Sequence, residues 1–565
     1  MSSDYPLGFE RYLTRFQTRH VPAYRFDLVV LGGGVAGGVA ALAAARRGLE
    51  VAVLTKGGLR DGNTRWARGG LAAVLSPEDS FDSHIADTLK CGRGLCDPEV
   101  VERIVTGGPK AVELLISLGA EFDRAPGGEL LLSREGGHSF KRIVHARGDS
   151  TGLEIQRALT DALRAEPRIT LFPDTFAIDL LESDGSVTGV LTKTPSENLV
   201  VYSASNVLLA TGGAGHIYRE TTNPVGATGD GVAMALRAGA QLRDLEFVQF
   251  HPTCLYIAGA ARVLISEVVR GAGGRLVDRD GVAFMREVHP DGELAPRDVV
   301  SRACFRRMVE TGDTSVYLDL SDVDGDPHAM FPNIGRTCRM FGMDIARDPI
   351  PVRPGAHYLV GGVAADAEGR TSLPGLWAVG ECASTGLHGA NRMGSNSLLE
   401  GLVLGMRAGE SFVRDVAPVF TDLAYEGGTR RRVHTGDPTV TVNIEDLTYS
   451  LKSMMWRQMG VERNHVGMSE AAEKIGFWQS VVQDLAEPNL GSWTLLNMLT
   501  VARMATLSAL AREESRGVHF RRDYPDTLEA FHGHSLLTPK LGGTRVESVS
   551  LENVPVASAR SAQNL

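Results

Sequence analysis

The sequence predicts an α/β fold in which a parallel sheet is interrupted by an inserted α+β region and followed by a helical C-terminal region. An apolar strand at 26–31 runs directly into a G-x-G-x-x-G turn at 32–37. Two later segments, 206–215 and 375–381, repeat this arrangement of an apolar strand followed by glycine. Three returns of the chain to one sheet imply that a separate region is inserted between the second and the third.

The first glycine turn has the residues that a phosphate-binding turn requires. Gly32 permits a tight turn off the strand, Gly34 lets the backbone approach a pyrophosphate, and Gly37 lets the next helix pack closely on the sheet. That helix, at 35–47, offers unpaired N–H groups and a positive dipole end. A second apolar strand at 51–55 completes a Rossmann-like unit, which predicts a bound dinucleotide.

The end of the second strand favours FAD over NAD as that dinucleotide. A carboxylate about 20 residues after the glycines usually binds the ribose hydroxyls of NAD. This chain has Thr55 and Lys56 instead. A lysine here suits a phosphate-rich cofactor that Lys56 would help to hold.

Length and composition exclude several classes of protein. A chain of 565 residues predicts two or three domains. Its 43% hydrophobic and 22% charged residues are typical of a soluble globular protein, and its net charge of −10 argues against a nucleic-acid surface. No apolar run approaches the roughly 18 residues that a membrane-spanning helix needs, and the first 25 residues lack a signal core. We therefore expect a cytoplasmic protein without a membrane partner.

The cysteines do not form a metal-binding or disulfide pattern. Six of them, at 91, 96, 254, 304, 338 and 382, are spread without C-x-x-C spacing. This distribution suits a reducing cytoplasm and predicts no zinc or iron–sulfur site. Arg11, Arg15 and Arg19 recur at helical spacing, which we interpret as a solvated helix face rather than a targeting helix.

The remaining elements follow from hydrophobic periodicity and glycine content. Residues 61–70 are too rich in glycine and polar residues to predict a helix. Helices are expected at 98–118, 153–165, 446–459, 469–485 and 493–516, and short strands at 176–181, 187–191, 199–202 and 206–210. A polar, arginine-rich linker is expected at 425–437. We predict an FAD-binding domain at 1–245 and 357–424, an inserted capping domain at 246–356, and a C-terminal helical domain at 425–565.

A series of ordered motifs resembles one known family. The motifs are 69–70, 211–215, 228–231, 249–253, 295–298 and 389–397, followed by 514–519 and 523–525 in the helical tail. Their order and sequence resemble the succinate dehydrogenase and fumarate reductase flavoprotein family. The resemblance implies bound FAD and a capping domain that serves the substrate.

Within that family, the segment 133–152 resembles the pattern of the L-aspartate oxidases. The resemblance implies FAD-dependent oxidation of L-aspartate to iminoaspartate, the first step of de novo NAD biosynthesis, with oxygen (giving H2O2) or fumarate as electron acceptor. It also raises a transient contact with quinolinate synthase. Two alternatives stay open: a soluble fumarate reductase or succinate-oxidising flavoprotein, and a non-catalytic subunit that carries FAD for an iron–sulfur partner.

The resemblance also implies how FAD is held. Succinate dehydrogenases attach FAD through a histidine in the loop before the paired glycines, and Asn63 stands at that position here. We therefore expect non-covalent FAD. The expected cofactor-binding residues are Gly32, Gly33, Gly34, Val35, Ala36, Gly37, Lys56, Asn63, Thr64, Arg65, Trp66, Ala67, Arg68, Gly69, Gly70, Asp230, Glu381, Ser397 and Leu398.

The candidate catalytic residues suit a C4 dicarboxylate. Planar, permanently charged Arg297 and Arg392 can grip its two ends better than lysine could, and His251 and His357 can add donors to a carboxylate. The resemblance assigns Arg297 as the acid or base, with Arg270 orienting the substrate. Because the pKa of arginine is above about 12, the chemistry of the residue supports a clamp more directly than a base.

Three further residues bear on substrate choice and on the flavin. Glu135 would favour the ammonium of aspartate over succinate, because a carboxylate there attracts the amine and repels a third anion. Ser266 stands where a substrate-contacting threonine is common in the family, and it keeps the hydroxyl. Arg68 stands where the family often has glutamine. For His138, His145 and His388 we expect structural hydrogen bonds.

Overall fold

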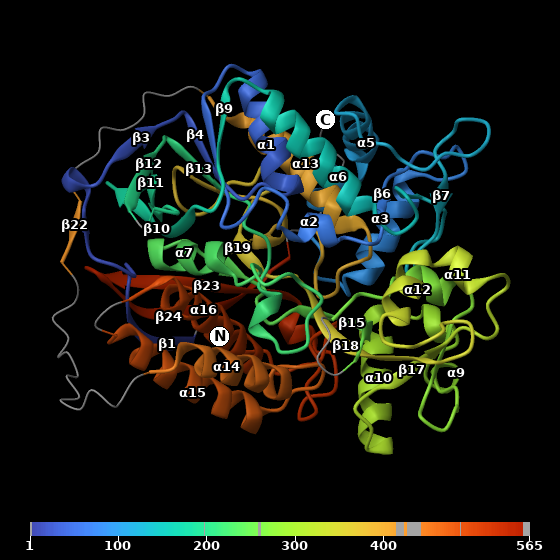
Figure 1. The fold of residues 1–565 in the computed structure, drawn as a ribbon. Helices are drawn as coiled ribbons and strands as arrows, with labels where there is room; N and C mark the ends of the chain where they lie inside the picture. The colour runs from blue at the N-terminus through green and yellow to red at the C-terminus, as the bar shows by residue number, and fades with distance from the viewer. Residues whose placement is uncertain are drawn as a thin grey trace.

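The computed structural model of this chain describes residues 3–196, 198–257, 262–413, 423–426, 442–485 and 488–556 (Figure 1). One five-stranded sheet, all parallel, has the order β20-β13-β4-β5-β9. Its strands are β4 (Leu28–Leu31), β5 (Val51–Leu54), β9 (Ile169–Phe172), β13 (Asn206–Leu209) and β20 (Leu376–Ala378). The prediction that three strand-and-glycine segments share one sheet is confirmed, since β4, β13 and β20 are neighbours.

The two faces of this sheet are covered by different layers. Leu28 and Val30 of β4 pack into a core with the helices α1 (Val35–Arg46), α6 (Thr151–Ala165) and α13 (Asn396–Ser411), which lie side by side in Figure 1. The alternate residues Val29 and Leu31 pack into a second core. That core includes residues of the sheet β10-β11-β12-β3, built from β3 (Ala23–Arg25), β10 (Phe176–Ser183), β11 (Ser186–Lys193) and β12 (Leu199–Ser203).

Helices α1 and α13 are unusually close because α13 presents glycines to α1. A Cβ on Gly405 would lie 2.6 Å from the carbonyl oxygen of Ala36, and a Cβ on Gly409 would lie 2.5 Å from that of Ala40. Contacts advance in the same direction along both helices, so the helices run parallel. Their N-termini, with their positive dipole ends, therefore lie at the same edge of the sheet.

Shorter elements connect these layers. They are β2 (Phe16–Gln17), η1 (Thr18–His20), α2 (Asn63–Trp66), β6 (Leu71–Ala72), α3 (Phe81–Cys91), α4 (Pro98–Thr106), α5 (Gly108–Ser117), β7 (Leu132–Ser133), β8 (Ile143–Val144), η2 (Gly215–Ile217), α7 (Asp230–Ala238), β14 (Leu242–Arg243), β19 (Gly362–Ala364), η4 (Gly380–Cys382), β21 (Ala383–Ser384) and β22 (Ala424–Tyr425).

Two sequence-based expectations for these connections are wrong in detail. Residues 61–70 contain the one-turn helix α2, because Asn63 and Thr64 are held by tertiary hydrogen bonds to Glu381 and Val35 that composition does not reveal. The single helix expected at 98–118 is two helices that meet at Gly107. Most of the linker expected at 425–437 lies outside the described residues.

The inserted region has a core of its own. Its four-stranded sheet has the order β15-β18-β17-β16, from β15 (Val248–Leu255), β16 (Arg275–Val277), β17 (Val316–Asp319) and β18 (Ile350–Leu359). Its helices are α8 (Glu267–Gly271), α9 (Met285–Val288), η3 (Gly292–Leu294), α10 (Arg297–Thr311), α11 (Pro327–Met330) and α12 (Pro332–Arg339). A separate cluster of buried residues from Leu255 to Val352 fills it, while β15 and β18 extend back toward the nucleotide-binding sheet.

The C-terminal region contains the expected helices and a β-hairpin that periodicity did not predict. The helices are α14 (Ile444–Gln458), α15 (His465–Gln483) and α16 (Leu490–Ala511), followed by η5 (Glu529–Phe531). The hairpin β23 (Gly533–Gly542) and β24 (Arg545–Pro555) pairs with β1 (Ser3–Glu10) on one side and β14 on the other, within a six-stranded sheet. The C-terminal region thus shares a core with the first part of the chain.

Contrary to the expectation from the sequence, one described helix is long and apolar enough to span a membrane by length and composition. Helix α16 has 22 residues with a mean hydropathy of 1.3 over its most apolar window, and 78% of that window is buried inside the protein. It packs among α14, α15 and α7, so its apolar character is that of a core helix.

The expected helix face of Arg11, Arg15 and Arg19 is also wrong. Residues 3–10 form β1, and the following residues are irregular up to β2 and η1. Arg11 is held by tertiary contacts instead, with an ion pair of 2.9 Å to Glu182 and a hydrogen bond to the carbonyl of Arg237.

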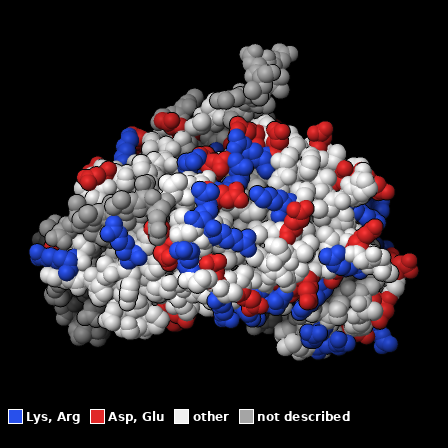
Figure 2. Space-filling model, turned by 90° about the horizontal axis from the view of Figure 1, so that it is seen from above, with Lys and Arg blue, Asp and Glu red and all other residues white. Residues whose placement is uncertain are grey.

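The face of the molecule over the helices of the nucleotide-binding sheet has interleaved charges. In Figure 2, blue Lys and Arg side chains alternate with red Asp and Glu side chains across this face. Exposed ion pairs of the nucleotide-binding domain include Arg168–Glu50 and Arg103–Glu368. A face of mixed sign lacks the continuous basic stripe typical of nucleic-acid binding.

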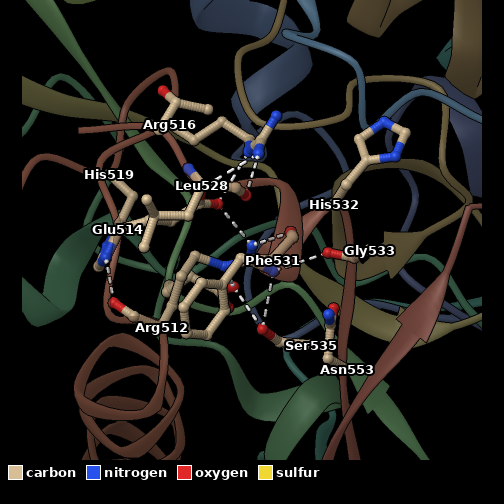
Figure 3. A network of polar contacts seen from close by, with 12 residues as sticks. Arg512, Glu514, Arg516, His519, Leu528, Phe531, His532, Gly533, Ser535 and Asn553 are labelled. Atoms are coloured by element: carbon tan, nitrogen blue, oxygen red, sulfur yellow. Dashed lines mark hydrogen bonds and ion pairs between the residues drawn. The ribbon is translucent and has the colours of Figure 1, made fainter.

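A buried arginine links the C-terminal region to the rest of the protein (Figure 3). Arg512 follows α16 and is 1% exposed. Its guanidinium bonds to Glu246 at 2.6 Å, to Glu514 at 2.9 Å and to Ser535 at 3.0 Å, and also to the carbonyls of Phe531 and Gly533. One side chain therefore joins the end of α16, the segment that leads into β15, and the hairpin.

Replacement of Arg512 by methionine is expected to destabilise the protein strongly. Arg512→Met would leave the buried carboxylate of Glu246 without its cation, which costs about 3–5 kcal/mol in comparable buried pairs, and would leave Glu514 paired with Arg516 alone. Urea unfolding followed by tryptophan fluorescence measures the loss. The control is Arg522→Met, which breaks the exposed pair with Glu462 and is expected to cost less than about 1 kcal/mol. Equal effects of the two variants would contradict a bridging role for Arg512.

Candidate active site

The glycine turn after β4 has no room for a side chain at Gly32 or Gly37. Gly32 has φ of +115°, and a Cβ there would lie 2.1 Å from the carbonyl oxygen of Ala210. A Cβ on Gly37 would lie 2.1 Å from the carbonyl oxygen of Gly32. A Cβ on Gly34 would lie 3.0 Å from the hydroxyl of Thr64, and no other described residue beyond its chain neighbours comes within 4 Å of it. The Thr64 hydroxyl accepts a hydrogen bond from the Val35 N–H. The turn, the close packing and the open approach at Gly34 fit a pyrophosphate-bearing ligand such as FAD.

The second strand ends in a charged pair rather than a free lysine. Lys56 Nζ lies 2.9 Å from Asp230 Oδ2 and donates to Thr228 Oγ1 at 2.8 Å. Asp230 opens α7 and also accepts from Asn497 Nδ2 at 2.7 Å. Two expected cofactor residues are thus in mutual contact, with the charge of Lys56 balanced by Asp230.

The 63–70 loop runs from the glycine turn toward the inserted region. Asn63 Nδ2 donates to Glu381 Oε2 at 2.9 Å, while its Oδ1 is buried without a hydrogen-bond partner. Arg68 pairs with Asp149 at 3.2 Å, and Trp66 is half exposed. Gly69 lies against Glu135, and Gly70 lies against His145. Asn63 thus has an amide where succinate dehydrogenases have a histidine, and its Oδ1 is available to a ligand. Both features fit a flavin that is held without a covalent bond.

The start of α13 connects the cofactor cradle with the substrate residues. Its N-cap Ser395 has φ of +62°, and Ser397 and Leu398 form the first turn. Ser397 Oγ accepts from Arg392 Nη2 at 2.5 Å. With α1 parallel and adjacent, two helix N-termini face the same edge, which favours an anionic or electron-accepting group there.

The candidate substrate residues come together from four elements. His251 lies on β15 and His357 on the paired strand β18, with their ring centroids 5.2 Å apart. Arg270 lies on α8 and Arg297 opens α10. Arg392 follows in the loop before α13. The structure therefore gathers residues that span 141 positions of sequence, from 251 to 392, at the junction of the inserted region and the nucleotide-binding domain.

The central observation is that two buried arginines have unsatisfied donors. Arg270 and Arg392 are 2% and 7% exposed. Arg270 Nε and Nη2 and Arg392 Nε and Nη1 are buried and make no hydrogen bond. Burial, with the neighbouring charge of Arg297, lowers the pKa of Arg392 to about 10, so it remains a cation at neutral pH. A buried cation with free donors is costly unless an anion joins it, so this arrangement fits a dianionic ligand.

Two polar residues hold the arginines in place, and the sequence motifs did not identify either of them as a site residue. Glu267 accepts from Arg297 Nε at 2.9 Å and lies 3.6 Å from Arg270 Nη2. Burial alone would raise the pKa of Glu267, but Arg297 and Arg270 outweigh it and lower the pKa to about 2. Gln249 accepts from Arg297 and donates to the carbonyl of Arg392 at 2.6 Å. Two features of the sequence could have identified them: Glu267 directly follows Ser266, and Gln249 is the first residue of the 249–253 motif.

The two histidines are neutral donors rather than cations. Burial, then the charges of Arg297, His357 and Arg270, lower the pKa of His251 well below its usual value. Burial and the charges of Arg392 and Arg297 do the same for His357. The Thr253 N–H donates to His251 Nδ1 at 3.3 Å, so Nε2 carries the hydrogen and is free to donate.

Glu135 lies inside the site on a firmly held loop. It is 5% exposed and accepts from Ser395 Oγ at 2.8 Å. A Cβ on Gly394 would lie 2.9 Å from both Glu135 Oε2 and Arg297 Nη2, so the carboxylate and the guanidinium flank the same residue. His138 Nε2 contacts the Gly394 carbonyl at 3.0 Å, and fully buried Arg142 anchors the loop to Asp79 and Asp87 of the α3 region.

The other predicted residues have well-defined local roles. Ser266 Oγ accepts from the Val268 N–H at 3.4 Å and caps α8, which leaves its own hydrogen for another acceptor. As expected, His138, His145 and His388 make hydrogen bonds within the protein, His145 to Ser133 and His388 to Glu400. Among the described residues, no group of three or more His, Cys, Asp or Glu side chains has the geometry to hold a metal ion.

Two protein-family models match most of this chain. An FAD binding domain matches residues 27–398, and a fumarate reductase flavoprotein C-terminal domain matches residues 448–562. L-aspartate oxidase of Mycobacterium tuberculosis is 45% identical over 519 residues, covering 90% of this chain and 94% of the relative. That of Streptomyces coelicolor is 44% identical, covering 88% and 89%, and the chloroplastic enzyme of Arabidopsis thaliana is 42% identical, covering 94% and 86%.

Solved structures give the same relationship. The flavoprotein FrdA of E. coli quinol fumarate reductase superposes with a TM-score of 0.85 at 33% identity, covering 96% of this chain and 99% of that one. Sdh1 of Mycobacterium smegmatis gives 0.82 at 32% identity, covering 95% of each chain. The chain belongs to the succinate dehydrogenase and fumarate reductase flavoprotein family, and within that family it is similar to the L-aspartate oxidases.

Proposed function

We propose that this chain oxidises L-aspartate to iminoaspartate with bound FAD, passing the electrons to oxygen, which gives H2O2, or to fumarate, as the first step of de novo NAD biosynthesis. The single observation that carries the proposal is the pair of buried arginines with free donors beside the buried carboxylate of Glu135. Two cations and one anion are complementary to a molecule with two carboxylates and one ammonium. The 40–45% identity to L-aspartate oxidases supports the same substrate.

The cofactor would lie along the edge formed by the glycine turn, the 63–70 loop and the start of α13. When bound, FAD accepts a hydride from the substrate carbon. The residues that would hold it are the backbone of 32–37 for the phosphates, Asn63 to Gly70, and Ser397 and Leu398 at the second helix N-terminus. Glu381 completes this set through its hydrogen bond with Asn63.

Each substrate residue has a distinct proposed role. Arg392 and Arg270 would bind the two carboxylates through their free guanidinium nitrogens, with His251, His357 and Ser266 adding neutral donors. Holding both ends fixes the substrate carbon relative to the acceptor, which is most of what a protein contributes to hydride transfer. Glu135 would pair with the ammonium.

Arg297 has a role that depends on the direction of reaction. Oxidation of aspartate removes a hydride from carbon and a proton from nitrogen, so no carbon-bound proton has to be abstracted and Arg297 would act there by charge and position. Reduction of fumarate requires one proton at carbon, and we assign its delivery to Arg297. The bound carboxylate of Glu267 holds the Arg297 side chain in a fixed orientation for this step.

A soluble fumarate reductase remains the second candidate function. The arginines and histidines would serve succinate or fumarate equally well, so Glu135 is the residue that discriminates between the two functions. We include in the proposal a cytoplasmic location and a transient contact with quinolinate synthase, which would take up the imine. The six cysteines, all in the described part of the chain, are free thiols and suit a reducing compartment.

FAD is expected to be released completely when the purified protein is denatured with acid. Asn63 stands where a histidine forms the covalent bond in succinate dehydrogenases, and an amide cannot form that bond. Absorbance at 450 nm is measured in the supernatant and in the redissolved precipitate. A covalently flavinylated succinate dehydrogenase flavoprotein, treated in parallel, serves as the control. Yellow colour that stays with the precipitate would refute non-covalent binding.

Replacement of Arg297 by lysine is expected to slow turnover without weakening FAD binding. Arg297→Lys keeps the charge but loses the fork that bonds Glu267 and Gln249, so flavin reduction by aspartate should slow about hundredfold, as when one preorganised donor is lost. Stopped-flow absorbance measures the rate. The control Arg302→Lys changes an arginine of the same helix that faces Phe520, and it should keep the rate. An unchanged rate in Arg297→Lys would show that the residue is misassigned.

Replacement of Glu135 by glutamine is expected to separate the two candidate functions. A hydrogen bond to a charged group contributes roughly 1.5–3 kcal/mol, so kcat/KM for aspartate should fall about tenfold to hundredfold. Fumarate carries no amine, so its reduction should be unchanged or faster. Both reactions are measured on one preparation, with Glu129→Gln, an exposed change in the same segment, as the control. Equal losses in both reactions would make Glu135 structural and remove the case for aspartate over succinate.

A further inference from the structure

The hydroxyl of Ser395 holds one oxygen of the Glu135 carboxylate. It donates to Glu135 Oε2 at 2.8 Å, and the two residues are 4% and 5% exposed. Within the described part of the chain this is the only hydrogen bond to that carboxylate, and Glu135 Oε1 accepts none. A hydrogen bond to an ionised group is stronger than one between neutral groups. The orientation of the carboxylate therefore depends on one hydroxyl, and Oε1 is left for a ligand.

The backbone of Ser395 has a conformation that serine rarely adopts. Its φ of +62° lies in the left-handed region, which favours glycine. Ser395 is also the N-cap of α13, where a serine side chain normally accepts a hydrogen bond from the first turn of the helix. Here the side chain makes no capping bond, and its hydroxyl is directed at Glu135. Helix capping therefore does not account for a serine at this position.

The unusual conformation is held from both sides by other elements. His138 Nε2 donates to the carbonyl of Gly394 at 3.0 Å, and the backbone N–H of Ala72 donates to the carbonyl of Ser395 at 3.3 Å. The side chain of the next residue, Asn396, binds Thr88 of α3 at 3.1 Å. A strained residue persists where its surroundings over-determine it, and such residues cluster at functional sites. The direction of the Ser395 hydroxyl is thus fixed by its neighbours.

Two glycines leave room for the pair formed by Ser395 and Glu135. A Cβ on Gly69 would lie 3.1 Å from Glu135 Oε1 and 3.5 Å from Ser395 Oγ. A Cβ on Gly394 would lie 2.9 Å from Glu135 Oε2 and 2.9 Å from Arg297 Nη2. The pair therefore lies between the 63–70 loop and the guanidinium of Arg297, where the substrate and the cofactor are expected to meet.

We propose that Ser395 determines the preference for an amine-bearing dicarboxylate, because its hydroxyl holds Glu135 with Oε1 toward the substrate ammonium. The inference rests on the proposed oxidation of L-aspartate and deepens it. Glu135 is the residue that would touch the ammonium, and Ser395 is a positioning residue that acts through it. A dicarboxylate without an amine makes no use of this pair.

The kinetic test removes the hydroxyl with Ser395→Ala. We expect kcat/KM for aspartate to fall about tenfold, the factor that one hydrogen bond to a charged group contributes. Fumarate reduction, measured on the same preparation, should be unchanged. Ser550→Ala is the matched control, because it removes another buried hydroxyl, one that donates to the Thr538 carbonyl in the C-terminal hairpin. That variant should keep both rates.

A double-mutant cycle tests whether Ser395 acts through Glu135. In the background of Glu135→Gln, the further change Ser395→Ala should reduce kcat/KM for aspartate by less than about twofold, since the ammonium partner is already lost. A purely structural role of Ser395 predicts the full loss in both backgrounds. Persistence of the full loss in the Glu135→Gln background would therefore overturn the inference.

Ser395→Gly separates the hydroxyl from the backbone and keeps the inference testable if Ser395→Ala does not fold. Glycine adopts a positive φ without strain, so this variant keeps the backbone conformation and loses only the hydroxyl. It should show the same loss with aspartate as Ser395→Ala. The FAD content and the Tm of each variant are measured alongside. A glycine variant with the wild-type rate would show that the hydroxyl has no role.

The outcomes distinguish the inference from the proposed function. A wild-type protein whose flavin aspartate does not reduce would refute the function itself. A wild-type protein that aspartate reduces, with Ser395→Ala and Ser395→Gly equal to it, would refute only the role of Ser395. Equal losses in aspartate oxidation and fumarate reduction would also refute that role, because they would show that Ser395 supports the site as a whole.

Discussion

The burial of guanidinium charge with unused donors is the constraint around which the rest of the site is arranged. Arg270 and Arg392 are removed from water, yet each keeps two nitrogens without a hydrogen bond. Such groups destabilise a fold unless other charges compensate or a ligand completes them. Glu267 compensates part of the charge at Arg270 and Arg297. Behind Arg392, whose guanidinium carbon lies 4.9 Å from the centroid of the Tyr358 ring, the buried carboxylate of Glu400 bonds to Tyr358 and His388. What remains unsatisfied points to an anion with two charged ends.

The fold explains how residues so far apart in sequence reach this position. The inserted region has its own core, so it can act as a rigid support, and its strands β15 and β18 extend back to the nucleotide-binding sheet with one histidine on each. Glycines on α13 let that helix run parallel to α1, which places Arg392 and Ser397 next to the cofactor cradle. Gln249 then joins the two halves, since it contacts both the Arg297 side chain and the Arg392 backbone.

Local patterns were sufficient for the parts of the fold that depend on local chemistry. The glycine turn, the three strands of one sheet and the C-terminal helices follow from periodicity and from the residues that a tight turn requires. The hairpin at 533–555 and the one-turn helix at 63–66 do not, because strand pairing with β1 and hydrogen bonds to Glu381 and Val35 determine them. The same division holds in the site. Charged residues in recognisable motifs could be named, whereas Glu267 and Gln249 acquire their roles only when distant elements bring them against Arg297.

The site separates what two substrates share from what distinguishes them. In the proposed site, the arginines and neutral histidines would recognise a C4 dicarboxylate, so aspartate and fumarate could both use them, and one site could then serve an electron donor and an electron acceptor in turn. The ammonium of aspartate requires a further partner, and in our proposal the buried Glu135 would provide it from a loop that Arg142 anchors to Asp79 and Asp87. The same loop also contacts the arginine cluster, because Glu135 and Arg297 flank Gly394 and Gly136 packs against Glu267, so a change in selection for an amine would also affect the arginines.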